Sequence, residues 1–382
     1  MNQQDLAALL QQGENSSIEF KESVGRPESL AREIVAFANS SGGIIIIGVT
    51  DNGIPRGIEV DKSLEEWVMN IARTSVIPAL TLQYEQIEYE GKSLGVITVP
   101  KGHDKPYQTG DKYLIRVGST NRTATQAELM RLFQMSGVFH YDAVPVQGAK
   151  TNDLNHAALD AYFSSYQLEF SQEDEEACDS LLINTDILTV DRIPTVAGML
   201  MFGLNPGRFL PQSGIMFAHY VGVDAGDELI DRQQINGTLP YCVDTAMAVI
   251  KNNLRNPSVI MGAKRMETRC IPPEKVFREA LVNACVHRNY AIAGSQIRVA
   301  MYANRIEFNS PGRLSNTITV DKLRSGVSYA NNPVLVKFMD NLRYMDRLGR
   351  GFPMIYREMQ KIGGEVSVRE LGEELRVTLA LS

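Results

Sequence analysis

The feature that most constrains the fold is the run "GGIIIIGVTD" at residues 42–51. Four consecutive isoleucines leave a strand no polar side, so the run is predicted to be a central strand buried on both faces. The stretch before it, "PESLAREIVAFANSSGG", carries apolar residues on one helical face, with Pro27 at its start and two glycines at its end. A helix that leads into a buried strand predicts a mixed α/β domain in the N-terminal part of the chain.

The length of 382 residues is more than one ordinary core accommodates, so at least two domains are expected. Strand-like runs at "TLQYEQIEYEGKSLGVITVP" and "KYLIRVGSTNR", closed by a helix at "TQAELMRLFQM" with a threonine cap, extend the first domain to about residue 140. Helices and strands alternate again in the last third. We therefore predict an α/β (α+β) protein with a first domain at 1–140, a helical linker region at 141–190 and a second domain at 191–382.

Composition excludes several classes of protein. The longest apolar stretches are under about twelve residues, so no membrane span is expected. The first residues lack a basic region followed by an apolar one, so we expect no secretory signal. The four cysteines have no CxxC spacing, which favours a reducing cytoplasm and gives no cysteine-based zinc site. They are Cys178, Cys242, Cys270 and Cys285.

The net charge of −7 disfavours a general nucleic-acid coat, so any nucleic-acid contact is expected on a local basic face. One basic stretch exists, and it comprises Lys101, His103, Lys105, Lys112, Arg116, Arg122 and Arg131. In contrast, "SQEDEEACDS" at 171–180 is predicted to be an acidic surface loop. Both segments are equally compatible with a solvated face, and that alternative stays open.

Three acids flank two predicted strands in the N-terminal part. Glu14 and Glu19 lie in "ENSSIEFKE", and Asp51 closes the isoleucine strand. If the two strands are neighbours, these carboxylates converge, and a hard cation such as Mg²⁺ or Mn²⁺ would neutralise them. The alternative is an amphipathic strand whose acids face water, followed by an ordinary β-turn.

The segments "ENSSIEFKES", "IVAFANSSGGIIIIGVTDNG" and "YLIRVGSTNRTAT" together resemble the Schlafen-type AlbA-like (AlbA-2) domain over about residues 10–140. The resemblance implies that Glu14, Glu19 and Asp51 are the catalytic, metal-binding acids of a nuclease that uses Mg²⁺ or Mn²⁺. It also implies a set of phosphate-binding residues. These are Lys21, Arg116 and Arg122, and Lys105 of the basic stretch is predicted with them as a nucleic-acid contact.

For function, the resemblance implies a nucleic-acid-binding protein, with RNA or DNA as partner and tRNA favoured. A metal-dependent endoribonuclease in phage defence is the first hypothesis. A non-catalytic, DNA-binding transcriptional regulator is the second. Animal Schlafens use two such lobes, so with one copy per chain a homodimer or higher homo-oligomer is expected.

A second motif is "REALVNACVHRNY", which places Glu279, Asn283 and His287 on one face of a predicted helix. The alternative is the solvent stripe of an amphipathic helix. The E-x-x-x-N spacing resembles the N-box of the GHKL ATPase group of gyrase, histidine kinases and MutL. That resemblance implies Glu279 as a base and Asn283 as an amide facing Mg²⁺.

The segments "RIEFNSPGRL" and "RLGRGFPMI" resemble, in the same order, the adenine-contacting strand and loop and the phosphate lid of that group. They add Asn309, Gly312, Gly349 and Gly351 to the predicted nucleotide site. From about residue 190 onward the chain is similar to proteins labelled ATP-dependent, RecG-related helicases, which implies a GHKL-like α/β sandwich and ATP as ligand. No GxxxxGK[ST] loop is present, so a P-loop helicase motor is not expected. A nucleotide-binding switch is therefore the third hypothesis.

Overall fold

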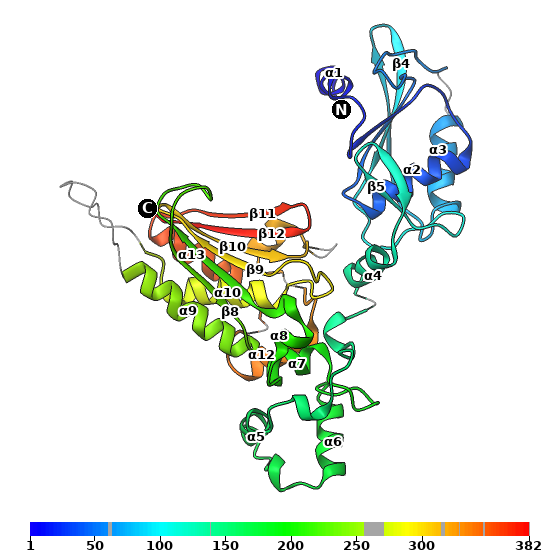
Figure 1. The fold of residues 1–382 in the computed structure, drawn as a ribbon. Coiled ribbons are helices and arrows are strands. Elements are labelled where there is room, and N and C mark those ends of the chain that lie inside the picture. The colour runs from blue at the N-terminus through cyan, green and yellow to red at the C-terminus, as the bar shows by residue number, and fades with distance from the viewer. Residues whose placement is uncertain are drawn as a thin grey trace, which may run out of the picture. The chain divides into compact units, whose positions relative to one another are not determined.

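The computed structural model describes residues 1–382 except 60–62, 138, 256–270, 315–317, 328, 347 and 382. The chain forms two compact units, Met1–Phe139 and His140–Ser382 (Figure 1). Both units mix helices with sheets, which confirms the predicted α+β class. Of the four cysteines, Cys178, Cys242 and Cys285 are free thiols, and Cys270 lies outside the described residues.

Unit 1 is a four-stranded sheet with an added hairpin. Its helices are α1 (Gln3–Gln12), α2 (Pro27–Asn39), α3 (Ser63–Thr74) and α4 (Gln126–Met135). Its strands are β1 (Ile18–Lys21), β2 (Gly43–Ile47), β3 (Gln83–Tyr89), β4 (Lys92–Val99), β5 (Leu114–Val117) and β6 (Thr120–Thr123). The sheet order is β1-β2-β4-β3, with β1 parallel to β2, and β5 pairs with β6 alone.

Strand β2 lies inside the sheet, as the isoleucine run predicts. Ile45 and Ile47 pack in one core cluster with α2, whereas Ile46 packs in the cluster on the opposite face. Because every second side chain of a strand points to the same face, an alternating run could not fill two cores at once. The prediction of burial on both faces is confirmed.

Helix α2 begins at Pro27, as predicted, because a proline at the first helical position loses no hydrogen bond. The chain leaves the helix through Gly42, whose φ of +80° favours glycine. A Cβ at that position would lie 2.7 Å from the Lys101 backbone nitrogen. The chain thus leaves the helix close to β4, and Asn39 at the helix end donates a hydrogen bond to the Leu114 carbonyl oxygen on β5.

Unit 2 is a six-stranded sheet covered by helices. Its α-helices are α5 (His156–Ser164), α6 (Glu175–Asn184), α7 (Val196–Phe202), α8 (Pro206–Phe209), α9 (Leu239–Arg255), α10 (Glu274–Val286), α11 (Val320–Arg324), α12 (Pro333–Asn341) and α13 (Gly351–Lys361). Its strands are β7 (Ile215–Tyr220), β8 (Leu229–Ile235), β9 (Ile297–Met301), β10 (Arg305–Pro311), β11 (Val366–Leu371) and β12 (Glu374–Ala380). Short 3₁₀ turns lie at η1 (Tyr141–Ala143), η2 (Thr151–Asp153), η3 (Phe170–Gln172) and η4 (Pro211–Ser213).

The strands run in the order β11-β12-β10-β9-β7-β8, antiparallel except for the β7–β9 pair. Helices α9, α10 and α13 lie along one side of this sheet (Figure 1). Their apolar residues join the inward side chains of the strands, such as Phe217, Val299 and Phe308, in one core cluster. The sheet therefore has one covered face, and the site of unit 2 forms between that face and the helices.

The acidic segment 171–180 is not a loop throughout. Helix α6 begins inside it at Glu175, with Asp174 as N-cap accepting a hydrogen bond from the Ala177 N–H. Acids in a first helical turn are stabilised by the unpaired N–H groups there. The predicted loop is wrong for this part, because the acids that indicate an exposed segment also favour a helix start.

One buried carboxylate ties the start of unit 2 to α12. Asp142 Oδ2 accepts hydrogen bonds from the Val334 N–H (2.8 Å) and the Leu335 N–H (3.0 Å), the orphan donors of the first turn of α12. Its Oδ1 is buried without a hydrogen bond. Burial raises the pKa of Asp142 to about 6, although the two N–H donors oppose that rise.

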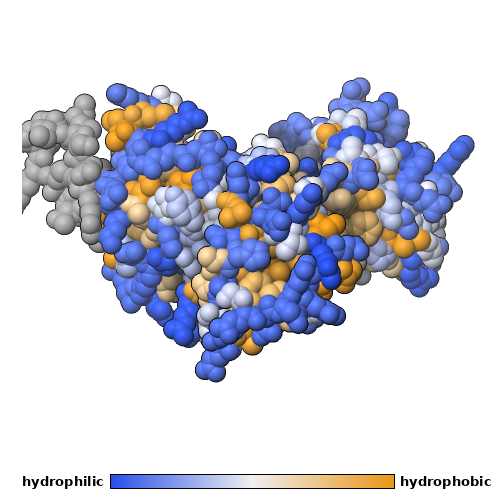
Figure 2. Space-filling model, turned by 60° about the horizontal axis from the view of Figure 1, so that its bottom comes forward, coloured by the Kyte–Doolittle hydropathy of each residue, from blue (hydrophilic) through white to orange (hydrophobic). Residues whose placement is uncertain are grey.

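No helix among the described residues is long and apolar enough to cross a membrane. On the face shown in Figure 2, hydrophobic residues form separate patches between hydrophilic ones.

Candidate functional site

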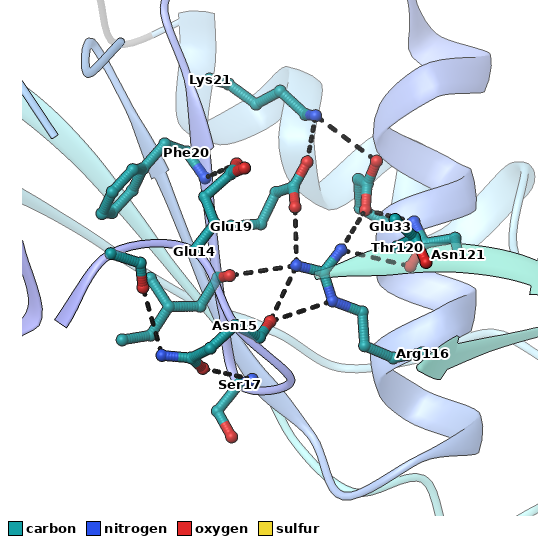
Figure 3. Close-up of polar contacts among 12 residues, drawn as sticks. Glu14, Asn15, Ser17, Glu19, Phe20, Lys21, Glu33, Arg116, Thr120 and Asn121 are labelled. Carbon is teal, nitrogen blue, oxygen red and sulfur yellow. Dashed lines mark hydrogen bonds and ion pairs between the residues drawn. The ribbon is translucent and has the colours of Figure 1, made fainter. Parts of the chain in front are cut away.

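The predicted acids of unit 1 lie where β1 and β2 run side by side. Glu19 on β1 is nearly buried, and each of its carboxylate oxygens meets a cation (Figure 3). Oε1 accepts a hydrogen bond from Lys21 Nζ, and Oε2 lies 2.8 Å from a terminal nitrogen of Arg116. Glu19 is therefore neutralised by side chains of the chain itself.

A fourth acid, Glu33 on α2, completes this arrangement. Its carboxylate lies 3.4 Å from Lys21 Nζ and 3.5 Å from Arg116 Nη1, and it accepts a hydrogen bond from Asn121 on β6. We call Glu19, Lys21, Glu33 and Arg116 the charge cluster. Two acids and two cations balance within it.

Sequence reasoning missed Glu33, although a signal was available. Glu33 stands three residues after Leu30 and four before Phe37, so it lies on the apolar face of α2. A glutamate at a buried position of a helix requires a partner cation.

Arg116 on β5 is the hub of the charge cluster. Its side chain is 1% exposed, and it donates to the carbonyl oxygens of Asn15 and Ile18 as well as to the two glutamates. The guanidinium also lies 4.9 Å from the centre of the Phe37 ring. All of its nitrogens are thus engaged, and it clamps the loop before β1 onto the hairpin (Figure 3). A phosphate has no open donor to bind here in this arrangement.

The two remaining acids lie nearby but outside the charge cluster. Glu14 Oε1 accepts a hydrogen bond from the Phe20 N–H at 3.0 Å. Burial raises the pKa of Glu14; the Phe20 hydrogen bond opposes the rise, and the negative charges of Glu19 and Asp51 add to it. Asp51 is exposed. The three predicted acids are therefore neighbours.

The donor set does not fit a resident metal ion in this arrangement, because both oxygens of Glu19 are occupied by cations. Across the residues that the structure describes, no group of three His, Cys, Asp or Glu side chains is placed to hold one.

The other predicted phosphate-binding residues of unit 1 are placed apart. Lys105 is buried, and its Nζ donates to the carbonyl oxygens of Asn39 and Ser40, where it caps the end of α2. Arg122 on β6 is 44% exposed and bonds both carboxylate oxygens of Glu128, at 2.8 and 2.7 Å. Of the basic side chains predicted to bind phosphate, Lys21 and Arg122 are those that reach the surface.

Unit 2 contains a cavity of about 350 Å³ between the sheet and the helices around it. Six of the seven residues predicted for a nucleotide lie on its walls. They are Glu279, Asn283, His287, Gly312, Gly349 and Gly351. Helix α10, the end of β10 and the start of α13 thus meet at one place, as the predicted N-box, loop and lid require.

The polar end of the cavity centres on Glu279. Asn283 donates a hydrogen bond to its Oε1 at 2.8 Å, and burial raises the pKa of the Glu279 carboxyl, with the negative charge of Asp346 adding to the rise. Gly351, the first residue of α13, lies directly against this carboxylate, so a Cβ there would overlap it. Glycine at position 351 is therefore needed for the start of α13 to lie so close to the Glu279 carboxylate.

His287 and Gly312 shape another part of the wall. Burial lowers the pKa of His287 to about 4, which keeps the ring neutral at physiological pH. Gly312 has a φ of +121°, and a Cβ there would lie 2.9 Å from Asn289 Cβ. The loop after β10 can therefore turn closely past the end of α10.

Asn309 is the predicted residue that the cavity excludes. Phe308 and Ser310 line the cavity, so Asn309, between them on β10, points to the other face of the sheet, where it accepts a hydrogen bond from Arg376 at 2.7 Å. Ser310 donates to the Ala284 carbonyl oxygen. Neither Asn309 nor Ser310 is an acid that could accept a hydrogen bond from an adenine amino group in the cavity.

The residues present nevertheless fit a nucleotide. Apolar side chains including Phe308, Leu314 and Leu375 form much of the wall, and a polar end faces the N-terminus of α13. Apolar walls with a few convergent polar groups are typical of ligand sites of this volume, and the free N–H groups of a helix start favour phosphate. Sequence reasoning missed Asp346, which lines the polar end.

Comparison with known proteins identifies two regions of the chain. Residues 14–125 match the family described as "Schlafen, AlbA_2", and residues 294–379 match the family described as "Putative ATP-dependent DNA helicase recG C-terminal". These matches confirm the predicted architecture of an AlbA-like N-terminal region and a RecG-related C-terminal region. None of the curated proteins matches the chain.

Two solved structures are similar to parts of the chain. A crystal structure from Corynebacterium diphtheriae is 22% identical, with a TM-score of 0.48, and the match covers 96% of this chain and 65% of that protein. This chain therefore spans about two thirds of that protein's length. The N-terminal domain of a RecG-related protein from Nitrosomonas europaea is 24% identical, with a TM-score of 0.25, over 33% of this chain and 94% of that domain.

Proposed function

We propose that this protein binds nucleic acid and that a nucleotide, ATP in the first instance, binds in the cavity of unit 2 and controls it. The observation that carries the proposal is the convergence of Glu279, Asn283 and Gly351 at the polar end of a cavity with apolar walls. The AlbA_2 and RecG-related matches indicate a nucleic-acid-binding protein.

Each end of the cavity has a proposed role. The apolar wall around Phe308 would hold the base, and the start of α13 would hold the phosphates. Asn283 and Glu279 would face the Mg²⁺ that accompanies them. Because the pKa of Glu279 is raised, its carboxylate is a stronger proton acceptor than an exposed glutamate.

Ligand-dependent stability tests this proposal. With ATP and Mg²⁺ at about 100 times Kd, the free energy of unfolding of the native chain should rise by about 2.7 kcal/mol. Asn283→Ala should abolish the gain. Asn252→Ala, at an exposed position of α9 in the same unit, is the matched control and should keep it. An equal gain in the Asn283 variant, or none in the native chain, would show that the cavity is not a nucleotide site.

A second candidate is a metal-dependent endoribonuclease acting on structured RNA such as tRNA. The observation that favours it is that Glu14, Glu19 and Asp51 are neighbours although they are separate in sequence. The occupied oxygens of Glu19 count against it. A phage-defence setting, and a homodimer that supplies a second lobe, belong to this candidate.

Cleavage of a labelled tRNA pool with Mn²⁺ or Mg²⁺ tests the nuclease. Asp51→Asn is the informative variant, because Asp51 is exposed and lies outside the charge cluster, whereas Glu19→Ala would also remove one of the two carboxylates that pair with Arg116. Cutting that is lost in Asp51→Asn and on chelation would establish the nuclease. Binding without cutting by the native chain would give the acids an architectural role and favour the non-catalytic regulator.

A further inference from the structure

The sheet of unit 2 has a second face, opposite the one that the helices cover. On β10, Ile306 and Phe308 enter the core, so Arg305, Glu307 and Asn309 point to the other side. By strand register, the residues directly opposite these three on the neighbouring strands point to the same side. None of the residues placed there by register belongs to the hydrophobic core cluster, although Glu307 and Asn309 in the middle of the face are buried among their neighbours' side chains. We call this side the open face.

Three arginines form a row across the open face. Arg369 on β11 lies directly opposite Arg376 on β12, Arg376 lies opposite Asn309, and Asn309 lies opposite Arg298 on β9. Adjacent strands are about 4.8 Å apart, so the row spans about 14 Å over its three strand spacings. Like charges opposite each other on neighbouring strands are unfavourable unless an anion lies over them.

Further charges make the open face basic. Arg305 and Arg232 also lie on it by register. The acids of its strands are Glu307, which pairs with Arg305 and Arg376, and Glu374, which pairs with Arg298, so the two glutamates offset part of the positive charge. Five arginines and two glutamates give the strands of this face a charge of +3, on a chain whose net charge is −7. The excess is local, so it indicates an anionic partner for this face.

Aromatic rings lie at one end of the same face. The Tyr220 and Tyr302 rings stack with their centroids 5.1 Å apart and their planes at 11°, and Arg305 lies 3.9 Å from the Tyr302 centroid. Tyr302 is thus covered on both sides, whereas Tyr220 is the outer ring and is only half-buried. A planar base can continue such a stack, and sheet surfaces that combine arginines with aromatic rings bind single strands in this way.

We propose that the open face binds single-stranded nucleic acid, with successive phosphates along the row Arg369–Arg376–Arg298 and a base on Tyr220. The proposal rests on the proposed function, since it names the surface and the form of nucleic acid involved. Two features favour a single strand over a duplex: bases in a duplex are already stacked, and the side chains in the middle of the face are small, where Ala218 and Ala300 lie opposite each other.

Fluorescence anisotropy with labelled oligouridylate and oligothymidylate of about 20 nucleotides tests the surface on the full chain. The test variant is Arg298→Gln with Arg369→Gln, since Arg369 is exposed and Arg298 is half exposed. The matched control is Arg192→Gln with Arg357→Gln, which removes the same charge from exposed sites elsewhere in unit 2. Tyr220→Leu tests the stack without changing charge.

We expect Kd to rise at least about tenfold in the Arg298/Arg369 variant and severalfold in Tyr220→Leu, with the control unchanged. Removing two phosphate contacts should also reduce the slope of log K against log salt by about 1.4. Binding by the native chain that the variant and its control weaken equally, or a matched duplex held as tightly with the same losses, would overturn the open face as a single-strand site. Failure of the native chain to bind any nucleic acid would instead overturn the proposed function.

Discussion

The charge cluster of unit 1 and the cavity of unit 2 both bury carboxylates, but the groups around those carboxylates differ. Glu19 and Glu33 are matched by Lys21 and Arg116, so their charges are balanced within the fold. Glu279 has an amide neighbour, Asn283, and an empty volume beside it. The difference teaches that convergence of acids does not by itself make a ligand site. A site also needs groups whose bonding capacity the fold leaves unused.

The largest expected effect follows from breaking the charge cluster. Arg116→Ala should lower the free energy of unfolding of unit 1 by about 3–5 kcal/mol, because it removes the buried one of the two cations that neutralise Glu19 and Glu33 and leaves only Lys21. The single tryptophan, Trp67, lies in unit 1, so its fluorescence in urea reports this unit alone.

Arg122→Ala is the control for that measurement, because its ion pair with Glu128 is exposed and should contribute little. If the two arginine variants unfold at the same urea concentration, the charge cluster is not what holds β1 to the hairpin.

A smaller effect is expected at Asp142, a buried acid whose hydrogen bonds come from backbone N–H groups. The pKa of Asp142 rises from 3.8 to about 6 on burial, so between about pH 4 and 6 the folded chain holds a proton that the unfolded chain has released. Its contribution to the free energy of unfolding therefore falls by up to about 3 kcal/mol as pH increases through that window. Asp142→Asn keeps one side-chain oxygen that can accept from the Val334 and Leu335 N–H groups, but it does not titrate.

Urea unfolding of the chain measures this contribution, followed by circular dichroism at several pH values between about 4 and 6.5, with Trp67 fluorescence marking the transition of unit 1. Relative to Asp142→Asn, the native chain should lose stability as pH increases. Parallel curves for the two proteins would mean that Asp142 has the same pKa folded and unfolded.

The smallest expected effect concerns the cavity. Gly351→Ala should weaken ATP binding about tenfold, or about 1.4 kcal/mol, because the new Cβ would displace the Glu279 carboxylate from the start of α13. Gly294→Ala is the control, since a Cβ there meets no atom within 4 Å. Calorimetric titration with ATP and Mg²⁺ compares them. Unchanged affinity in Gly351→Ala would mean that nucleotide, if bound, does not approach α13.

The parts of the fold that the sequence predicts well are those where local and tertiary preferences agree. The isoleucine run could only be a doubly buried strand, and Pro27 and Gly42 mark the limits of α2 from both ends. The helical spacing of Glu279 and Asn283 likewise brings them to one wall of the cavity. In each case, the residues that determine the outcome are close together in the sequence.

The parts that the sequence does not predict depend on distant partners. Arg116 bonds the carbonyl oxygens of Asn15 and Ile18, about a hundred residues earlier in the chain. The residues near Arg116 in sequence give no sign of these contacts, so its burial depends on the tertiary structure. Asn309 is a different case. The family resemblance predicts it in the nucleotide site, although strand alternation with Phe308 would have assigned it to the face away from the cavity.

Successive side chains of strand β10 point alternately into two different environments. Phe308 and Ser310 face the cavity, while Glu307 and Asn309 face the arginines on the other side. A substitution series along this strand should therefore split into two interleaved phenotypes, one at even and one at odd positions. Because β10 forms part of both the cavity wall and the open face, a shift of this strand changes both surfaces at once.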